Sequence, residues 1–230
     1  HQHTYCIGGN STAEYFGEPG KLDDRITDRT CETCNSYNML KLDKLLFLSN
    51  PSVSLADYYE TTLFNHIYAT QNHETGMVLY FSPLATGSKK ESNKSFSSRF
   101  DSFWCCVGSG WENHAKYGEC IYFKTPENDL IINQFIGSEL KWPERNLTLS
   151  QITRFPEEGK ASFLLKMNQA QQFAIHLRLP GWTTSRYQVS INGEIQKIDI
   201  KPGNYIVINR KWKDGDQIEY LLPMPFSSIS

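Results

Sequence analysis

Long apolar runs are missing from this sequence. No stretch approaches the roughly 18 consecutive apolar residues of a membrane-spanning helix, and the start has no charged-then-apolar signal sequence. We therefore expect no membrane partner, and the compartment stays open between periplasm, exterior and cytoplasm. The chain begins His1-Gln2-His3 rather than with Met, which we interpret as a processed or partial polypeptide.

An excess of positive charge is missing as well. The 23 lysines and arginines are matched by 25 acidic residues, for a formal net charge of -2. A polyphosphate backbone is bound through a basic surface, so we expect no nucleic-acid partner. The 230 residues are 39% hydrophobic, which is ordinary for a globular protein with one large domain or two small ones.

Cysteine is too scarce for a disulfide scaffold, with six residues in 230. Four of the six fall in two clusters, Cys31–Cys34 and Cys105-Cys106, and the first cluster also contains a carboxylate. This clustering favours a metal site or a catalytic thiol over structural cross-links. Cys6 and Cys120 have no partner motif, and we interpret them as small buried hydrophobic residues.

The apolar pattern changes character near residue 125. Helical spacing before that point predicts helices over 30–49, with Thr30 as N-cap, over 54–67 and over about 111–121. A short strand is expected at 77–81 and a polar loop at 85–98. After residue 126, short apolar runs separated by turns such as Asn192-Gly193 predict strands at 130–136, 147–153, 161–167, 173–179, 187–191, 205–208 and 218–222. The class is therefore α+β, with a second part that is an antiparallel β-sandwich or jelly roll.

The two cysteine clusters can be combined into one metal site. Glu32, Cys34, Cys105 and Cys106 would form a set of three thiolates and one carboxylate, which suits zinc. Neighbours on a regular helix point about 100° apart, so the adjacent cysteines must sit on a turn or a helix start. Glu32 and Cys34 likewise converge only at or before the first turn of a helix. Zinc would keep such thiols deprotonated at neutral pH, as a cysteine nucleophile requires.

Other interpretations of the same residues stay open. Cys31 and Cys34 have the CxxC spacing of zinc sites and thiol redox centres, although a single CxxC is a weak signal. Glu14, in the glycine-rich loop 8–16, is a candidate acid/base for a nearby thiolate. Most acidic residues near such loops are simply solvated, so local sequence alone gives this role little support.

Five motifs occur in a fixed order along the first part of the chain. They are Gly8-Gly9-x-Ser11-x-x-Glu14-x-Phe16, Glu32-Thr33-Cys34-Asn35, Tyr58-Tyr59-Glu60 with Leu63-Phe64-Asn65, Tyr80-Phe81-Ser82-Pro83-Leu84, and Phe103-Trp104-Cys105-Cys106. Their order and spacing resemble the β-L-arabinofuranosidase glycoside hydrolases of families 127 and 146. The segments 176–182 and 212–216 are similar to the β-sandwich of that family.

This resemblance implies a fold for each part of the chain. Residues 1–125 would be the C-terminal portion of a catalytic (α/α)6 barrel, and residues 126–230 the β-sandwich that follows it. Three long helices cannot close a twelve-helix barrel, so we expect this chain to be a C-terminal piece without the family's N-terminal half. The zinc ligands would be present and the pocket walls absent, so activity of the chain by itself is not implied.

The resemblance also implies a retaining mechanism with a cysteine nucleophile. Cys105 would attack the sugar, and Glu14 would act as general acid/base, with Glu18 as the alternative a few residues away. Glu60 and Tyr80 match positions that contact the sugar. The metal would be zinc, bound by Glu32, Cys34, Cys105 and Cys106.

The expected substrate is an arabinose-containing plant glycan or glycoprotein, bound as a small oligosaccharide or glycan, and the oligomeric state is left open. The alternative function is a zinc-stabilised, non-catalytic carbohydrate-binding protein. Its sugar would stack on exposed aromatic rings of the second part, such as Trp142, Trp182 or Trp212.

Overall fold

A computed structural model describes residues 2–91 and 96–226 of the chain. The chain forms two compact units, the first made of His1–Pro51 with Asp57–Tyr117 and the second of Ser52–Ala56 with Gly118–Ser230. Four residues of the polar loop expected at 85–98, namely 92–95, lie outside the described part. Across the described ranges, no helix combines the length and apolar character needed to cross a bilayer.

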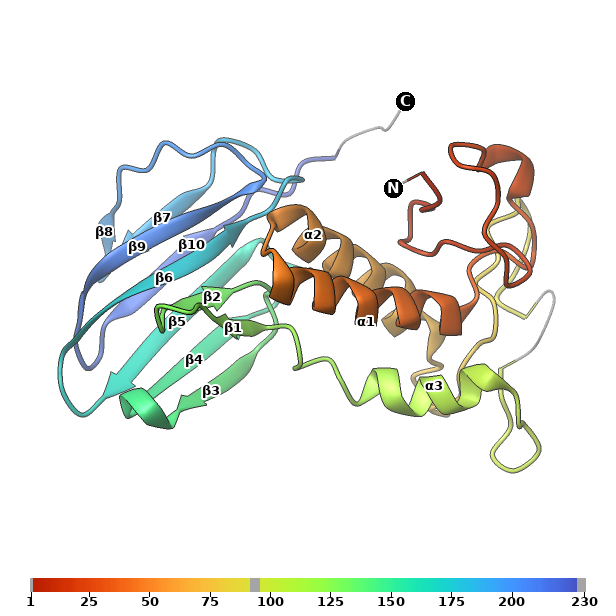
Figure 1. Cartoon of the computed structure of the whole chain (residues 1–230), viewed down its shortest axis with the longest axis horizontal. Helices are drawn as coiled ribbons and strands as arrows, with labels where there is room; N and C mark the ends of the chain where they lie inside the picture. The colour runs from red at the N-terminus through yellow and green to blue at the C-terminus, as the bar shows by residue number, and fades with distance from the viewer. Residues whose placement is uncertain (1, 92–95, 227–230) are drawn as a thin grey trace. The chain divides into compact units, whose positions relative to one another are not determined.

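The first unit is built on helices and irregular segments (Figure 1). The two long helices expected from periodicity are confirmed, and the second continues into a short π-helix. The helical elements are η1 (Asp23–Arg25), α1 (Thr33–Ser49), α2 (Val53–Thr62), η2 (Leu63–Ile67), η3 (Tyr68–Thr70) and α3 (Cys105–His114). Residues 53–56 of α2 are counted with the second unit. The N-cap of α1 is Glu32 rather than the expected Thr30. Thr30 instead uses its hydroxyl to accept from Thr27 N–H and to donate to Thr27 C=O in the preceding turn, at 2.7 and 2.9 Å.

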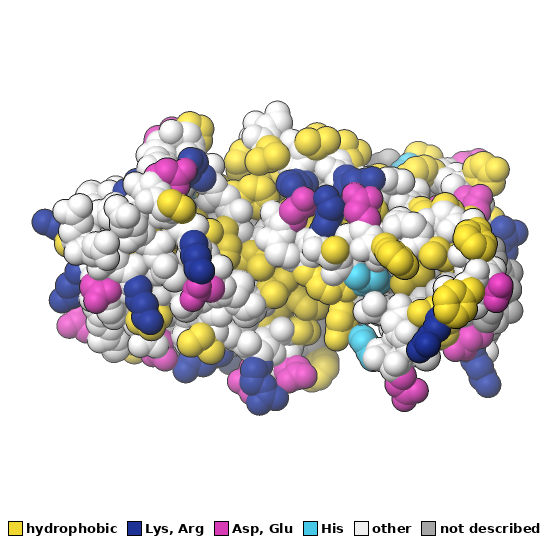
Figure 2. Space-filling view, turned by 90° about the horizontal axis from the view of Figure 1, so that it is seen from below, with side chains coloured by type: hydrophobic (Ala, Val, Ile, Leu, Met, Phe, Trp, Pro, Cys, Tyr) yellow, Lys and Arg dark blue, Asp and Glu magenta, His cyan; other side chains and the backbone are white. Residues whose placement is uncertain are grey.

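Helix α1 has apolar side chains on two opposite sides. Tyr37, Leu40 and Phe47 are buried, whereas Leu42 and Leu45, which belong to the periodic pattern, are 46% and 64% exposed. Hydrophobic side chains also reach the surface between interspersed basic and acidic ones on the face shown in Figure 2. The periodicity therefore identified the helix correctly, but its outer leucines are not part of the core of this chain.

Two elements of the first unit differ from the sequence-based expectation. The third helix begins at Cys105 and ends at His114, earlier than the expected 111–121. The expected strand at 77–81 has only two isolated bridges, Glu32 with Phe81 and Gln71 with Val78. A continuous strand needs a continuous partner, and α1 begins directly after Glu32.

The second unit consists of two sheets. A four-stranded sheet has the order β1-β2-β6-β9, and a six-stranded sheet has the order β3-β4-β5-β10-β7-β8. All neighbours are antiparallel except the pair β2 and β6. The strands are β1 (Tyr122–Lys124), β2 (Leu130–Ile132), β3 (Ser138–Trp142), β4 (Leu147–Thr153), β5 (Lys160–Met167), β6 (Gln171–Leu179), β7 (Gln188–Ile191), β8 (Glu194–Ile195), β9 (Asn204–Trp212) and β10 (Gln217–Leu221). The seven expected strands are present, the first of them ending at Ile132.

Alternating side chains from both sheets meet in one apolar core. In β4, for example, the inward residues Leu147, Leu149 and Gln151 are buried, while the residues between and after them are partly or largely exposed, as period-two burial requires. Trp142 and Trp212 belong to this core, with 6% and 0% exposed. Neither ring is therefore available to stack on a sugar, which is what the alternative carbohydrate-binding function required.

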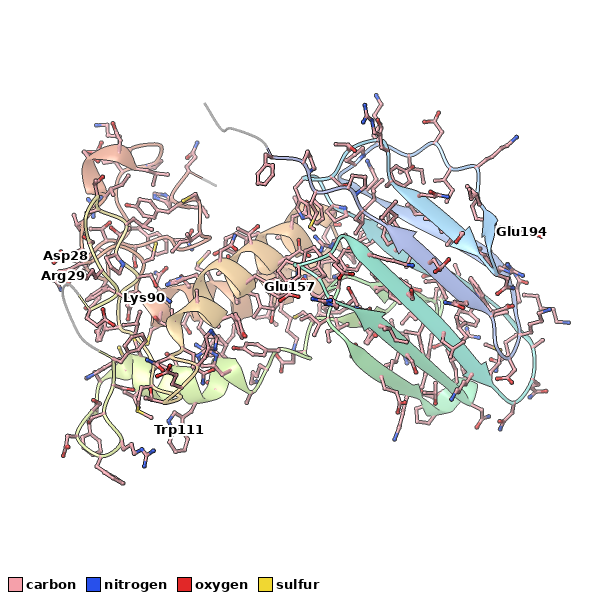
Figure 3. The ribbon with its side chains drawn as sticks, turned by 180° about the vertical axis from the view of Figure 1, so that it is seen from behind. Asp28, Arg29, Lys90, Trp111, Glu157 and Glu194 are labelled. Atoms are coloured by element: carbon pink, nitrogen blue, oxygen red, sulfur yellow. The ribbon has the colours of Figure 1, made fainter. Side chains whose placement is uncertain are left out.

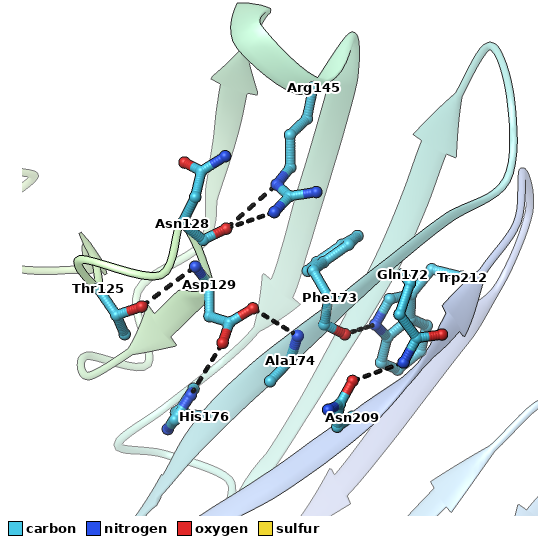
Figure 4. A network of polar contacts seen from close by, with 10 residues as sticks. All are labelled: Thr125, Asn128, Asp129, Arg145, Gln172, Phe173, Ala174, His176, Asn209 and Trp212. Atoms are coloured by element: carbon cyan, nitrogen blue, oxygen red, sulfur yellow. Dashed lines mark hydrogen bonds and ion pairs between the residues drawn. The ribbon is translucent and has the colours of Figure 1, made fainter.

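Polar contacts join the strands of the four-stranded sheet to one another and to the connections beside them (Figure 4). The Asp129 carboxylate accepts the Ala174 N–H at 2.8 Å and lies 4.0 Å from the His176 ring. The buried Trp212 indole donates to the Phe173 carbonyl at 3.1 Å. Trp182, the third tryptophan named for the alternative carbohydrate-binding function, is partly buried and stacks on Phe155.

Candidate active site

The four residues expected to bind a metal converge in the first unit. One ligand atom each from Glu32, Cys34, Cys105 and Cys106 can be chosen so that all four lie within 4.8 Å of one another. Glu32 caps α1 and Cys34 is its second residue, whereas Cys105 and Cys106 open α3. Both pairs thus lie at helix starts, as their spacing required, because only there can such close neighbours turn to one point.

The distances in this cluster suit zinc. Cys34 Sγ lies 3.3 Å from Cys106 Sγ, and the two adjacent sulfur atoms of Cys105 and Cys106 are 3.8 Å apart. The Glu32 carboxylate oxygen Oε1 is 3.5 Å from Cys105 Sγ and 3.8 Å from Cys106 Sγ. Sulfur ligands at about 2.3 Å from a tetrahedral zinc lie roughly 3.8 Å from each other. Three sulfur donors and one carboxylate at these separations therefore fit the metal with only small adjustments.

The pKa shifts of the four side chains also favour binding of a cation. The contact with Cys106 and the hydrogen bond with Ser109 lower the pKa of the Cys34 thiol to about 7. The same contact with Cys34 raises the pKa of Cys106, while burial raises the pKa of Cys105 and of Glu32. The protein thus favours one thiolate and opposes further negative charge, since like charges repel in a partly desolvated site. A divalent cation would remove that opposition.

Cys31 does not share this site, although it is three residues from Cys34. Its side chain is fully buried, and a Cβ atom added at Gly9 would lie 2.4 Å from its sulfur. Its backbone is left-handed, with φ 59°, which turns the side chain away from those that follow. Burial raises the pKa of the Cys31 thiol to about 12. A Cys31–Cys34 metal or redox pair, the alternative suggested by the CxxC spacing, is not what this geometry forms.

Tyr80 connects the cluster to Glu14. Its hydroxyl donates to the Glu14 carboxylate and accepts from the Cys105 thiol, the latter at 3.4 Å. The pKa of Tyr80 is raised, first by burial and then by its hydrogen bonds to Cys105 and Glu14. Tyr80 therefore stays protonated at neutral pH and holds a carboxylate and a thiol on one oxygen atom.

Glu14 is presented at the tip of a tight turn. Thr12 and Tyr15 exchange backbone hydrogen bonds of 3.0 and 3.1 Å around it. The two residues between them, Ala13 and Glu14, have φ of 49° and 74°. Left-handed backbone at two consecutive residues other than glycine is sparsely populated and is often found at functional sites. Glu18, the alternative acid/base, pairs with Lys21 through an ion pair at its exposed carboxylate.

Other side chains around the cluster were not expected from sequence. The Ser109 hydroxyl lies 3.1 Å from Cys34 Sγ, and the Ser11 hydroxyl accepts the Glu32 N–H at 3.1 Å. Ser109 follows Cys106 by three residues, so helical spacing alone could have placed it on the same side of α3.

Glu60, expected to contact the sugar, is buried in α2 with 4% exposed, and its contact with a sugar stays a prediction.

A hollow of about 880 Å³ lies beside Cys105. Its lining includes Phe103, Trp104 and Trp111, of which Phe103 and Trp111 are more than four-fifths exposed. Figure 3 shows Trp111 projecting outward from α3. Tyr80 and Glu14 are not among the residues that line this hollow.

Comparison with known proteins decides the family. Residues 1–119 match the family described as "Beta-L-arabinofuranosidase, GH127 catalytic domain", and residues 129–224 match its middle domain. The chain belongs to glycoside hydrolase family 127. The resemblance inferred from the five motifs is thereby confirmed, and so is the α+β class.

Relatives in family 127 are much longer than this chain. A non-reducing end β-L-arabinofuranosidase of Bifidobacterium longum is 25% identical over 234 residues, which cover 96% of this chain and 35% of that protein. A GH127 β-L-arabinofuranosidase structure from Geobacillus stearothermophilus is similar with a TM-score of 0.79 and 25% identity, over 99% of this chain and 37% of that one. A further GH127 β-arabinofuranosidase structure has a TM-score of 0.79 and 26% identity, over 96% and 37%. The chain spans little more than a third of the length of these relatives.

Proposed function

We propose that this chain is part of a retaining β-L-arabinofuranosidase with Cys105 as nucleophile and Glu14 as general acid/base. The observation that carries the proposal is the Tyr80 hydroxyl, which contacts both Glu14 and Cys105. Two groups that contact one hydroxyl lie within roughly 6 Å of each other. Retaining glycosidases hold their two carboxylates about 5 to 5.5 Å apart, and here a thiolate would take the place of the attacking carboxylate.

The first step forms a thioglycoside. The Cys105 sulfur donates an electron pair to the anomeric carbon, and the bond from that carbon to the leaving oxygen breaks. Glu14 gives its proton to that oxygen, so the leaving group departs as a neutral alcohol. Zinc, when bound by Glu32, Cys34, Cys105 and Cys106, supplies the positive charge that keeps these thiols deprotonated.

The second step releases the sugar. Glu14, now a carboxylate, takes a proton from water as the water oxygen attacks the anomeric carbon. The carbon–sulfur bond breaks, and Cys105 regains its electron pair. Two displacements at one carbon restore the original configuration, so the product keeps the β anomer.

The assignments of substrate and architecture belong to the same proposal. The substrate would be a terminal β-L-arabinofuranoside of a plant glycan or glycoprotein, with Glu60 and Tyr80 contacting the sugar. The helices of residues 1–125 would form part of an (α/α)6 barrel, and the two sheets of residues 126–230 an antiparallel, jelly-roll-like sandwich. The similarity to longer β-L-arabinofuranosidases supports the sugar and the architecture, while the plant glycan and the sugar contacts of Glu60 and Tyr80 rest on the motif resemblance.

The metal part of the proposal is tested by elemental analysis of the purified chain. We expect about one zinc per chain in the parent and in Cys31→Ala, and less than a tenth of that in Cys34→Ala. The reason is that Cys34 is in the cluster while Cys31 packs against Gly9. Loss of zinc in Cys31→Ala with retention in Cys34→Ala would overturn the ligand set.

The chemical part is tested with an aryl β-L-arabinofuranoside whose leaving group needs no acid. In Glu14→Ala the first step should proceed and the second should stall, so that intact-mass and peptide analysis find an arabinosyl adduct on Cys105. The matched variant Glu18→Ala should accumulate no more adduct than the parent. An adduct on another residue, or accumulation in Glu18→Ala instead, would contradict the assigned roles.

A further inference from the structure

Ser109 is the one described hydroxyl side chain in hydrogen-bond contact with a sulfur of the four-residue cluster besides Tyr80. Its Oγ lies 3.1 Å from Cys34 Sγ. Ser109 is in α3, and Cys34 is in α1. The contact therefore joins the two helices that each supply half of the ligand set.

The position of Ser109 follows from helix geometry. It comes one turn after Cys105 and Cys106, so its side chain lies on the same side of α3 as the ligand cysteines. Cys34 reaches α3 from the opposite helix and lies between Cys106, at 3.3 Å, and Ser109. The Cys34 sulfur is thus held from two sides by groups of α3.

We propose that Ser109 is a positioning residue for the metal site, which fixes Cys34 as a ligand that stays on the metal; the inference rests on the zinc site proposed above. A metal-bound thiolate keeps lone pairs that accept hydrogen bonds, and such outer contacts typically change metal affinity 10- to 100-fold. Because a metal-bound thiolate carries no proton, the Ser109 hydroxyl would be the donor to Cys34. The described contacts of Cys105 are instead with Tyr80, Glu32, Cys106 and Cys34. The hydrogen bond from Ser109 thus acts on the retained ligand Cys34 rather than on the proposed nucleophile Cys105.

If Ser109 had a merely structural role, its replacement would lower the unfolding temperature of the metal-free and the metal-bound chain equally. Alanine is the best helix former, so Ser109→Ala should not weaken α3 itself. The gain in helix propensity offsets the modest net contribution of the lost Ser109–Cys34 hydrogen bond, so the metal-free variant should unfold close to the temperature of the metal-free parent. The larger loss should appear in the presence of metal, as a smaller zinc-dependent rise in the unfolding temperature.

The experiment measures zinc affinity by competition with a chromophoric chelator, in the parent, Ser109→Ala, Ser109→Thr and the control Ser54→Ala. Ser54 is an exposed serine of α2 whose hydroxyl contacts Ser52. We expect a dissociation constant about tenfold higher in Ser109→Ala. Ser109→Thr, which keeps a hydroxyl, should restore the parent value, and Ser54→Ala should match it.

Cobalt(II) substitution gives a second readout that does not depend on turnover. The sulfur-to-cobalt charge-transfer band should move to longer wavelength in Ser109→Ala, because a thiolate that has lost a hydrogen bond gives up charge more easily, and return in Ser109→Thr. An unchanged affinity and spectrum in Ser109→Ala, or equal losses in the alanine and threonine variants, would overturn the role of Ser109. A parent chain that binds neither zinc nor cobalt would contradict the metal site itself rather than this residue.

Discussion

The Cys34 and Cys106 sulfur atoms lie 3.3 Å apart, although 72 residues separate them in the sequence. Cys31, only three residues from Cys34, faces Gly9 instead. Spatial and sequence neighbours of Cys34 are therefore different residues. The site is therefore built by two helices, and it is not the local CxxC site that the sequence spacing suggests.

Oxidation of the metal-free chain should report this difference directly. Diamide removes two hydrogen atoms from a pair of neighbouring thiols, so peptide mapping should find a Cys34–Cys106 disulfide. Zinc-loaded protein should be protected because its thiolates are engaged. Cys31→Ser should still form the cross-link, whereas a predominant Cys31–Cys34 disulfide would show that the cluster geometry is wrong.

The close approach of Gly9 to Cys31 should make Gly9 intolerant of a side chain. Gly9→Ala places a Cβ 2.4 Å from Cys31 Sγ and 2.5 Å from Cys31 Cβ. Such overpacking costs about 1 to 3 kcal/mol, which urea unfolding would measure as a lower free energy of unfolding.

A second glycine provides the opposite case. Apart from the adjacent residues and the nearby backbone of α3 itself, no atom of the described residues lies within 4 Å of a Cβ added at Gly108. Gly108→Ala should therefore raise the free energy of unfolding by up to about 1 kcal/mol, the difference in helix propensity. Equal effects of the two substitutions would mean that Gly9 does not pack against Cys31 as described.

The buried carboxyl of Asp43 in α1 should make stability depend on pH. Burial raises the pKa of Asp43 to about 7, whereas an aspartate in an unfolded chain titrates near 3.9, an approximate reference value. Between roughly pH 4 and pH 7 the folded chain binds more protons than the unfolded chain, so its free energy of unfolding falls as pH rises. The loss contributed by this group is up to about 4 kcal/mol.

Asp43→Asn removes the titration and serves as the test. Thermal unfolding should show that the variant is more stable than the parent at pH 8, with the advantage shrinking toward pH 4. Asp24→Asn, at an exposed position of η1, should have the same unfolding temperature as the parent at each pH. If the difference in unfolding temperature between the parent and Asp43→Asn stays constant across this pH range, Asp43 does not titrate within it.

Local sequence was sufficient where short-range chemistry decides the structure. Asn192-Gly193 predicted a hairpin, and both residues have positive φ, 53° and 83°, between the paired residues Ile191 and Glu194. β4 has the expected bounds, 147–153, because its alternating side chains face a core on one side and solvent on the other. In both cases the signal and its cause lie within a few residues.

Where tertiary contacts decide, local sequence was insufficient. The start of α3 contains Gly108 and Gly110, which lower helix propensity, and its first turns are held by contacts with α1. β3 was missed because three of its five side chains are polar or charged and it lies at a sheet edge. The convergence of Glu32 and Cys34 with Cys105 could be expected from sequence only as a chemical hypothesis and through the resemblance to a family.

The outward leucines of α1 affect the calorimetry of this chain. The heat capacity change of unfolding grows with the apolar area that water reaches only after unfolding. Leu42, Leu45, Leu46 and Leu48 already meet solvent in the folded state, with 46% to 64% of each exposed. They add less to that heat capacity change than buried leucines would, so α1 should contribute less curvature to the stability–temperature profile than its leucine content suggests.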